Sequence, residues 1–140
     1  MNDVAFVDTN ILVYAHDRDA GSKRDRAVRL LEELWESGNG RLSVQVLQEF
    51  YVSVTRKLAT PVARSLAREV IGSYGAWVRE ATTPEIVLRA VEISELAQLS
   101  FWDGLVVSSA EQAGATLLYS EDFQAGRLIA GIRIVNPLVE

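Results

Sequence analysis

A chain of 140 residues is long enough for one domain with a hydrophobic core and too short for two domains of ordinary size. It has no cysteine and a single histidine, His16, which excludes disulfides, thiol catalysis, cysteine-based zinc sites and relays of several histidines. The net charge of −5 argues against salt-driven nucleic-acid binding by the whole surface, although acidic residues that hold a metal would contribute to the same number.

The N-terminal residues and the length of the apolar runs indicate the cellular location of the protein. The start Met1-Asn2-Asp3-Val4 lacks the basic segment and apolar core of a secretion signal. No apolar run approaches the roughly 20 residues that a membrane-spanning helix needs. We therefore expect a cytoplasmic protein without a membrane segment, with residues 1–140 forming one domain.

The first half of the chain alternates between strand-like and helix-like patterns. Val4 to Val7 is a continuous apolar run, which predicts a buried strand followed by a helix. The next helix carries an apolar stripe at helical spacing, is capped by Ser22 and ends at glycines 38 and 40. Residues 42–46 predict a second strand that runs directly into another helix.

The second half continues this alternation. Thr60-Pro61 and Thr83-Pro84 each predict a helix start, because proline in the first helical position loses no hydrogen bond. Residues 77–81 are a weak strand candidate, and a further helix is predicted from Ser100 to Gly114.

The remaining apolar runs, residues 115–119 and 132–135, predict two more strands. Strands that alternate with helices are typical of an α/β fold. We therefore expect a mostly parallel sheet of four or five strands with helices on both faces.

Four carboxylates stand apart in the sequence, each among apolar neighbours, and they are Asp8, Glu49, Asp103 and Asp122. A carboxylate beside buried residues is costly unless its charge is compensated. If the four converge they repel one another, and a divalent cation with a preference for oxygen ligands, Mg²⁺ or Mn²⁺, compensates that charge. Such a cluster indicates metal-assisted hydrolysis of phosphodiesters.

Structural roles compete with this interpretation for the first two acids. Asp8 precedes a predicted helix, where aspartate is a common N-cap that contributes about 1 kcal/mol. Glu49 lies within a predicted helix, where an ion pair or a solvated edge position explains a glutamate equally well.

Structural roles also exist for the other two acids. Ser100 and Asp103 have the spacing of a capping box, although Asp103 shares a helical stripe with Val106 on the side expected to be buried. Asp122 follows Glu121 at a predicted helix start, so either acid can serve as the ligand or complement the helix dipole.

Basic residues near Glu49 are candidates for contact with a nucleic-acid backbone. On a regular helix Ser53 and Arg56 share the face of Glu49, at i+4 and i+7. We expect Arg56 and Lys57 to bind RNA phosphates, against the alternative that both belong to a solvated helix face.

At the four acids the sequence resembles a known family, the PIN-domain ribonucleases, and specifically the toxins of VapBC toxin–antitoxin pairs. The resemblance covers the whole chain, and the ordered set of motifs is more specific than any single one. The motifs read Phe6-Val7-Asp8-Thr9-Asn10-Ile11-Leu12, Gln48-Glu49-Phe50, Ser100-Phe101-Trp102-Asp103-Gly104-Leu105-Val106 and Leu118-Tyr119-Ser120-Glu121-Asp122-Phe123.

The resemblance implies roles for individual residues. Asn10 would hold Asp8 in place, and Ser120 stands where the family often has threonine or serine. Gly104 departs from the alanine of the family pattern, which should weaken its helix slightly. The catalytic and metal-binding quartet would be Asp8, Glu49, Asp103 and Asp122.

The resemblance also implies a function. The chain would be an Mg²⁺- or Mn²⁺-dependent endoribonuclease, the toxin of a toxin–antitoxin pair acting on structured RNA. It would be inhibited by a VapB-like antitoxin and would form a homodimer. If the large aromatic residues lie exposed in one patch, that patch would support an interface with a protein partner. These residues are Trp35, Phe50, Tyr51, Trp77 and Trp102.

Other classes of protein remain as alternatives. The sequence Asp8-Thr9-Asn10 lacks the second aspartate of a metal-dependent phosphatase. A phosphoacceptor domain requires a lysine near the last strands, where this chain has Arg127 and Arg133. A housekeeping RNA-processing nuclease of the PIN type, and a non-catalytic interaction module whose acids are helix caps, are the other two.

Overall fold

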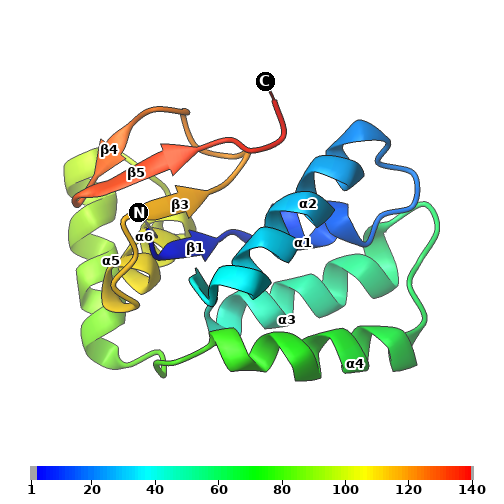
Figure 1. The fold of residues 1–140 in the computed structure, drawn as a ribbon. Helices are drawn as coiled ribbons and strands as arrows, with labels where there is room; N and C mark the ends of the chain where they lie inside the picture. The colour runs from blue at the N-terminus through cyan, green and yellow to red at the C-terminus, as the bar shows by residue number, and fades with distance from the viewer. Residues whose placement is uncertain (1–2, 140) are drawn as a thin grey trace.

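The computed structural model describes residues 3–139 and places one five-stranded sheet at the centre, with strand order β2-β1-β3-β5-β4 (Figure 1). β1 (Ala5–Val7) pairs in parallel with β2 (Gly40–Arg41) and with β3 (Leu117–Tyr119). β3 pairs in parallel with β5 (Ile132–Val135), whereas β4 (Leu128–Ile129) runs antiparallel to β5. The predicted mostly parallel sheet is thus confirmed.

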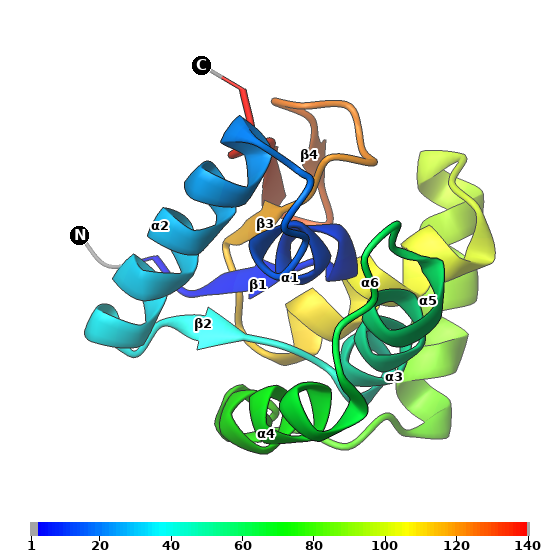
Figure 2. The same cartoon turned by 90° about the vertical axis from the view of Figure 1, so that its right-hand side faces the viewer.

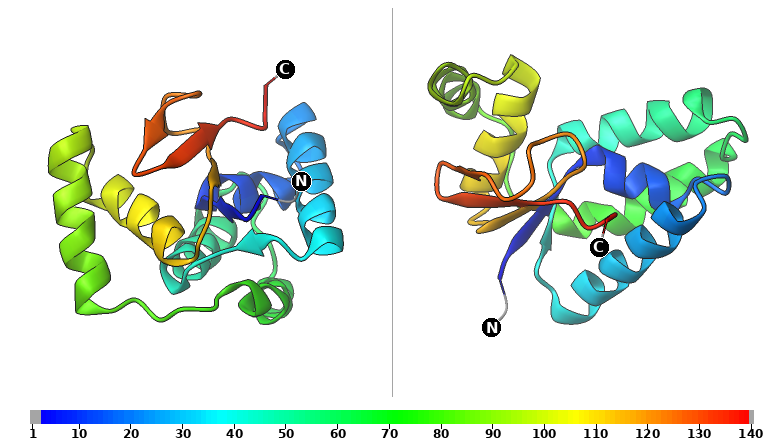
Figure 3. Two further views of the ribbon diagram at one scale, coloured as in Figure 1. Left: turned by 60° about the vertical axis from the view of Figure 1, so that its left-hand side comes forward. Right: turned by 90° about the horizontal axis from the view of Figure 1, so that it is seen from above.

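Helices cover both faces of this sheet, as predicted. Figure 2 shows α2 on one side of the strands and α5 and α6 on the other, and Figure 3 shows the same layers from two further directions. The helical elements are α1 (Thr9–Ala15), α2 (Ser22–Ser37), α3 (Val44–Val52), the π-helical turn η1 (Ser53–Lys57), α4 (Arg64–Tyr74), the 3₁₀ turn η2 (Gly75–Trp77), α5 (Pro84–Ala97) and α6 (Phe101–Gln112). Among the described residues no helix is both long and apolar enough to cross a membrane.

The core lies between the strands and the first helices. Phe6 and Leu118 from neighbouring strands are fully buried, together with Ile11 and Leu12 of α1 and Phe50 of α3. Because the side chains of α1 and α3 are locked into this core, the polar residues that begin α1 and line α3 are held in fixed positions.

Two glycines permit close packing between elements. A Cβ on Gly40 in β2 would lie 2.6 Å from the ring of Trp77, so the strand passes directly against that ring. A Cβ on Gly104 in α6 would lie 2.5 Å from the carbonyl oxygen of Ala90 in α5. Gly104 therefore permits the close approach of α6 to α5. The expectation that Gly104 weakens its own helix slightly stays a prediction.

Local turn chemistry overrides two of the strand predictions. The Ser43 hydroxyl accepts a hydrogen bond from the Val46 N–H at 3.3 Å, which starts α3 at Val44 and limits β2 to Gly40–Arg41. The predicted strand at 42–46 is thus wrong in position. The weak candidate at 77–81 is not a strand, because η2 occupies its start.

Two predicted helix starts are also misplaced. α4 begins at Arg64 rather than at Pro61, because the Val62 N–H donates to the Val54 carbonyl at 2.8 Å and holds the preceding residues as a loop. Ser22 is the first residue of α2 and not its cap, since Gly21 takes the cap position at a φ of 62°. The starts at Thr83-Pro84 and Ser100 are confirmed, and each of those two hydroxyls caps its helix.

The large aromatics do not form one exposed patch, so that expectation is wrong. Phe50 and Trp77 are buried, with 1% and 4% of their surfaces exposed. Trp35 and Trp77 pack together, with ring centroids 4.8 Å apart. Trp102 on α6 is 63% exposed and stands apart from that cluster.

Candidate active site

β1 and β3 are neighbours in the middle of the sheet, and they bring distant polar residues together at their carboxyl ends. Val7 and Tyr119 are register partners, so Asp8 and Ser120 leave the sheet side by side. The Asp8 N–H donates to the Tyr119 carbonyl at 2.9 Å. Sites in open parallel sheets form beyond the carboxyl ends of the strands, and Asp8 and Ser120 lie at that edge here.

Asp8 is both a helix cap and a buried carboxylate. Its Oδ1 accepts a hydrogen bond from the Thr9 N–H at 2.8 Å, and its Oδ2 accepts one from the Ser120 hydroxyl at 2.7 Å. Burial is the main cause that raises its pKa to about 6, against the lowering effect of the bonds from Ser120 and Thr9, and the charges of Asp122 and Glu49 raise it further. Asp8 therefore caps α1 through one oxygen and is joined to the end of β3 through the other.

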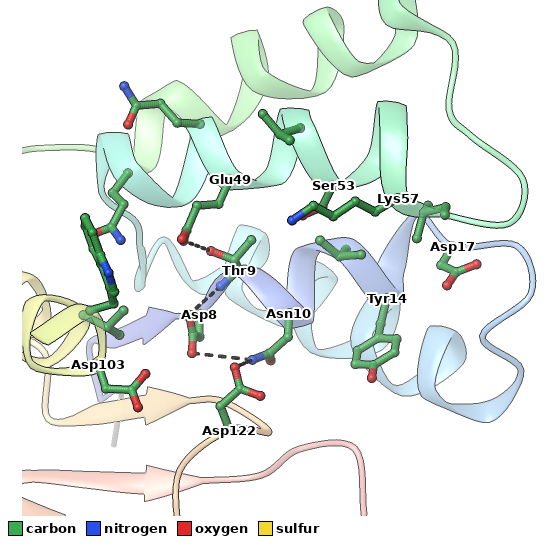
Figure 4. A pocket seen from close by; sticks show the side chains of 17 residues that line it. Asp8, Thr9, Asn10, Tyr14, Asp17, Glu49, Ser53, Lys57, Asp103 and Asp122 are labelled. Carbon is green, nitrogen blue, oxygen red and sulfur yellow. Dashed lines mark hydrogen bonds between the residues drawn. The ribbon is translucent and has the colours of Figure 1, made fainter. Parts of the chain in front are cut away.

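Asn10 connects the first and last acids of the predicted quartet. Its Nδ2 donates to Asp122 Oδ2 at 2.9 Å and lies 3.5 Å from Asp8 Oδ2 (Figure 4). Its Oδ1 accepts a hydrogen bond from the Glu121 N–H at 3.3 Å. Ser120 adds a second link, because its hydroxyl also accepts from the Asp122 N–H at 3.0 Å. Asn10 and Ser120 thus fix the loop after β3 relative to Asp8.

Glu121 and Asp122 point to different surroundings, although they are adjacent. Tyr14 donates to Glu121 Oε1 at 2.6 Å, and Lys23 donates to its Oε2 at 2.5 Å. Burial raises the pKa of Glu121, but the bonds from Lys23 and Tyr14 outweigh burial and leave this pKa below its usual value. Glu121 is engaged with α1 and α2, whereas Asp122 faces the pocket described below.

Glu49 approaches from α3. The Thr9 hydroxyl donates to Glu49 Oε1 at 3.0 Å, which joins the start of α1 to the middle of α3 (Figure 4). The contact of Thr9 is not predictable from the local sequence, because a threonine after an aspartate carries no sign of a partner 40 residues away. Glu49 forms no ion pair with a cation among the described residues.

Asp103 lies in the first turn of α6. The Ser100 hydroxyl accepts a hydrogen bond from the Asp103 backbone N–H at 3.1 Å, so Ser100 supplies the cap. Burial raises the pKa of the Asp103 carboxyl, the hydrogen bond with Ser100 lowers it, and the charge of Asp122 raises it further. The cap explains the position of α6 but leaves the carboxylate facing the pocket.

One pocket of about 640 Å³ gathers the four predicted acids. Figure 4 shows Asp103 at one end, with Asp8, Glu49 and Asp122 near the middle. The described residues that line it also include Asp17, whose side chain accepts a hydrogen bond from the Asp19 N–H at 3.0 Å. The four predicted acids therefore share one pocket, which is lined by the residue after β1, by α1, α3, η1 and α6, and by the loop after β3.

Lys57 and Arg56 take different positions relative to the pocket. Lys57 lines the pocket and is the one cationic side chain that does so among the described residues. Arg56 is exposed and lies outside the lining, so its expected place beside Glu49 is wrong. The buried Ser120 does not line the pocket either, but its hydroxyl reaches the site by donating to Asp8 Oδ2.

The donors in the pocket fit a hard divalent cation. They are carboxylate oxygens, with no cysteine in the chain and no histidine among the described lining residues. Burial is the largest cause that raises the pKa of Asp8 and of Asp103, and the charge of Asp122 raises both further, so both carboxyls sense the charge of Asp122. Within residues 3–139 no three acids or imidazoles lie close enough together to form a ready-made ion site.

Comparisons with known proteins agree with this fold. The PIN domain family model matches residues 5–128. No protein with a curated description matched the chain.

Among solved structures, a toxin–antitoxin complex from Klebsiella pneumoniae is 19% identical, with 95% of this chain and 97% of that chain covered and a TM-score of 0.67. VapC20 of Mycobacterium tuberculosis, a toxin that cleaves the sarcin–ricin loop, is 21% identical, with coverage of 84% and 89% and a TM-score of 0.60. VapBC2 of Rickettsia felis, bound to a DNA fragment from its promoter, is 18% identical, with coverage of 93% and 96% and a TM-score of 0.58.

Proposed function

Since this chain belongs to the PIN-domain family, we propose that it is a metal-dependent endoribonuclease, and more specifically the toxin of a toxin–antitoxin pair that cleaves structured RNA. One observation carries the proposal. The four acids that stand apart in the sequence line a single pocket, and they are Asp8, Glu49, Asp103 and Asp122. A set of helix caps has no reason to converge in this way, which disfavours the non-catalytic interaction module.

In this proposal the four carboxylates hold Mg²⁺ or Mn²⁺. When bound, such an ion supplies activation of water and positive charge at the scissile phosphate. Ser120, Thr9 and Asn10 orient Asp8 by hydrogen bonds, so its oxygens are positioned before the substrate arrives. Because burial raises the pKa of Asp8 to about 6, a cation also stabilises the ionised form of this carboxyl.

Glu49 is exposed, as is Asp122, and its carboxylate is held by a hydroxyl rather than by backbone. It therefore suits a role at the open side of the pocket, either as a ligand or as the group that orients the attacking water. Asp122, restrained by Asn10, is the fourth ligand in this proposal, while Glu121 anchors the loop through Lys23 and Tyr14.

A VapB-like antitoxin and a second copy of the chain are the proposed protein partners. The support is that the similar structures include toxin–antitoxin complexes from Klebsiella pneumoniae and Rickettsia felis. The rim of the pocket adds exposed apolar surface at Val52 and Trp102, and its acidic floor suits a basic side chain from the partner.

Cleavage of RNA by the purified protein tests the proposal. Structured RNA is incubated with the protein with and without Mn²⁺, and the cut ends are sequenced to locate the bonds broken. Calorimetry with Mn²⁺ is run beside it. Mn²⁺ binding with cleavage supports the nuclease, Mn²⁺ binding without cleavage favours a phosphotransfer protein, and absence of both leaves the interaction module.

A further inference from the structure

The helix that carries Glu49 ends in a π-helical turn. α3 runs to Val52 and continues without interruption as η1, Ser53–Lys57. Val54 of this turn is fully buried, and the Thr55 hydroxyl donates to the Tyr51 carbonyl at 2.6 Å. Single π turns inside α-helices are rare and occur frequently at functional sites, because they change which side chains face a given direction.

The turn changes which basic residue faces the pocket. In an α-helix each residue advances about 100°, so Arg56 would come within about 20° of Glu49 and Lys57 would be about 80° away. In a π turn, with about 4.4 residues per turn, each residue advances only about 80°. From Ser53 onward this smaller step brings Lys57 within about 10° of Glu49 and leaves Arg56 about 75° away.

The positions of the side chains agree with this rotation. Ser53 and Lys57 line the pocket together with Glu49, whereas Arg56 does not. Figure 4 shows the amino end of Lys57 pointing back along the helix toward Glu49. Helical side chains lean toward the helix N-terminus, which is the direction of the acidic site here.

The charges around Lys57 explain what its amino group can bind. Among the described residues no hydrogen bond or ion pair engages Lys57, whereas Lys23 is committed to Glu121. Within the described part of the chain Lys57 is also the one cation among the charged residues of the lining, and the others are acids. In Figure 4 Glu49 lies between Asp103 on one side and Ser53 and Lys57 on the other.

We propose that the π turn of η1 selects Lys57, instead of Arg56, as the residue that binds a substrate phosphate beside the scissile one, at the end of the pocket away from Asp103. The inference rests on the proposed nuclease function and adds the direction in which the RNA strand leaves the site. Lys57 is a positioning residue for the strand, and the carboxylates remain responsible for the bond that breaks. A lysine amino group recognises phosphate as a point charge, which suits a backbone contact without sequence preference.

Matched single variants test the proposal. Lys57→Met and Arg56→Met each remove one positive charge from neighbouring positions of the same turn, and Lys57→Arg keeps the charge. Cleavage of a short RNA with Mn²⁺ is followed at several salt concentrations. For Lys57→Met we expect KM to rise about 10-fold with little change in kcat, since a hydrogen bond to a charged group is lost.

The salt dependence gives a readout that a structural role would not alter. Loss of one phosphate contact reduces the slope of log(kcat/KM) against log salt by about 0.7, the value for single strands. Arg56→Met should leave both slope and KM within about twofold, and Lys57→Arg should restore most of the wild-type KM. Calorimetry should give the wild-type Mn²⁺ affinity for all three, because none of these side chains is a proposed ligand.

Several outcomes would overturn the proposal. Equal losses in the Arg56 and Lys57 variants would mean that the turn does not select between them. Unchanged RNA kinetics in Lys57→Met together with weaker binding of a co-expressed protein partner would assign Lys57 to that partner. If the wild-type protein cleaves no RNA, the proposed function fails and this inference fails with it, which is distinct from a wild-type enzyme that the Lys57 variant leaves unaffected.

Discussion

At the scale of single residues, Asp8 is one carboxylate that both caps a helix and lines the pocket. It caps α1 through its Oδ1 and receives the Ser120 hydroxyl on its Oδ2. Those bonds lower its pKa, yet burial outweighs them and holds the pKa at about 6, above the ordinary value of 3.8. The metal-free fold therefore carries a carboxyl that is easier to ionise after unfolding.

This shift predicts how stability changes with pH. Because the folded pKa is raised, the native state binds more protons than the unfolded state between about pH 4 and pH 6, so stability falls as pH rises through that window. Asp8→Asn retains a capping side chain and removes the titration. In thermal melts without metal, the free energy of unfolding of the variant should rise relative to that of the wild type across this window. The difference should reach about 3 kcal/mol at pH 7. Parallel curves for the two proteins would contradict the shift.

Asp103→Asn should abolish cleavage without unfolding the protein. The cap of α6 uses the Ser100 hydroxyl and the Asp103 backbone N–H, which the substitution does not touch. Removing a carboxylate that burial and Asp122 already disfavour should leave the stability of the metal-free protein equal or higher, while Mn²⁺ affinity falls. The measurements are cleavage assays and melts with and without Mn²⁺.

Ser100→Ala is the matched control for that experiment. It removes the cap and should cost about 1 kcal/mol of stability while cleavage persists. Full cleavage activity in Asp103→Asn would show that Asp103 acts only at the helix start.

Asp122→Asn and Glu121→Gln separate two neighbours that composition alone does not distinguish. Asp122→Asn should reduce kcat by about 100-fold or more, because it removes a proposed ligand of the catalytic ion. Glu121→Gln should keep kcat within about tenfold and mainly loosen the loop, since Glu121 contacts Tyr14 and Lys23 and not the pocket. Mn²⁺ titrations of both variants check the assignment, and the reverse order of effects would transfer the ligand role to Glu121.

At the scale of elements, the contact between α5 and α6 depends on a missing side chain. A Cβ at Gly104 would lie 2.5 Å from the Ala90 carbonyl oxygen and 3.0 Å from the Ser94 Cβ. Because backbone atoms of α5 form this contact, a rotamer change cannot relieve it. α6 carries Asp103 one residue earlier, so the depth at which the helix packs also sets the position of that carboxylate.

Gly104→Ala should therefore destabilise the protein by about 1–3 kcal/mol, despite the better helix propensity of alanine. Gly72→Ala in α4 is the matched control, because nothing lies within 4 Å of a Cβ built there. We expect it to stabilise the fold by about 1 kcal/mol. Urea unfolding measures the change in the free energy of unfolding for each variant. A stabilised Gly104→Ala protein would mean that α5 and α6 separate easily.

At the scale of the whole molecule, the proposed toxin function predicts an effect on cells. Expression of the gene alone should arrest growth, and expression with the neighbouring gene for the antitoxin should relieve the arrest and yield a co-purifying complex. The Asp103→Asn protein, which keeps its fold in our prediction, should be harmless on its own and still bind the partner. Normal growth with the active protein and no co-purifying partner would favour a housekeeping nuclease of the same family.

Elements whose signals are local could be predicted from the amino-acid sequence alone. The apolar run before Asp8 and the capping residues Thr83 and Ser100 predicted their strand and helix starts correctly, because each signal lies within a few residues of its effect. The four acids could also be identified from local sequence, because each has apolar neighbours. In the folded chain all four line one pocket.

Where distant segments select one of two adjacent residues, the outcome could be read only from the folded chain. Lys23 engages Glu121 from 98 positions away and leaves Asp122 for the pocket. The hairpin that adds β4 turns at Ala130-Gly131, where both residues have positive φ, and alanine carries no local sign of that turn.

The π turn of η1 belongs to the same group, because local sequence on a regular helix assigns Arg56 to the side of Glu49 and the folded chain places Lys57 there. The physical reason is common to these cases. A side chain's immediate neighbours set its backbone preference, but which of two neighbours faces a site depends on the packing and hydrogen bonds of residues far along the chain.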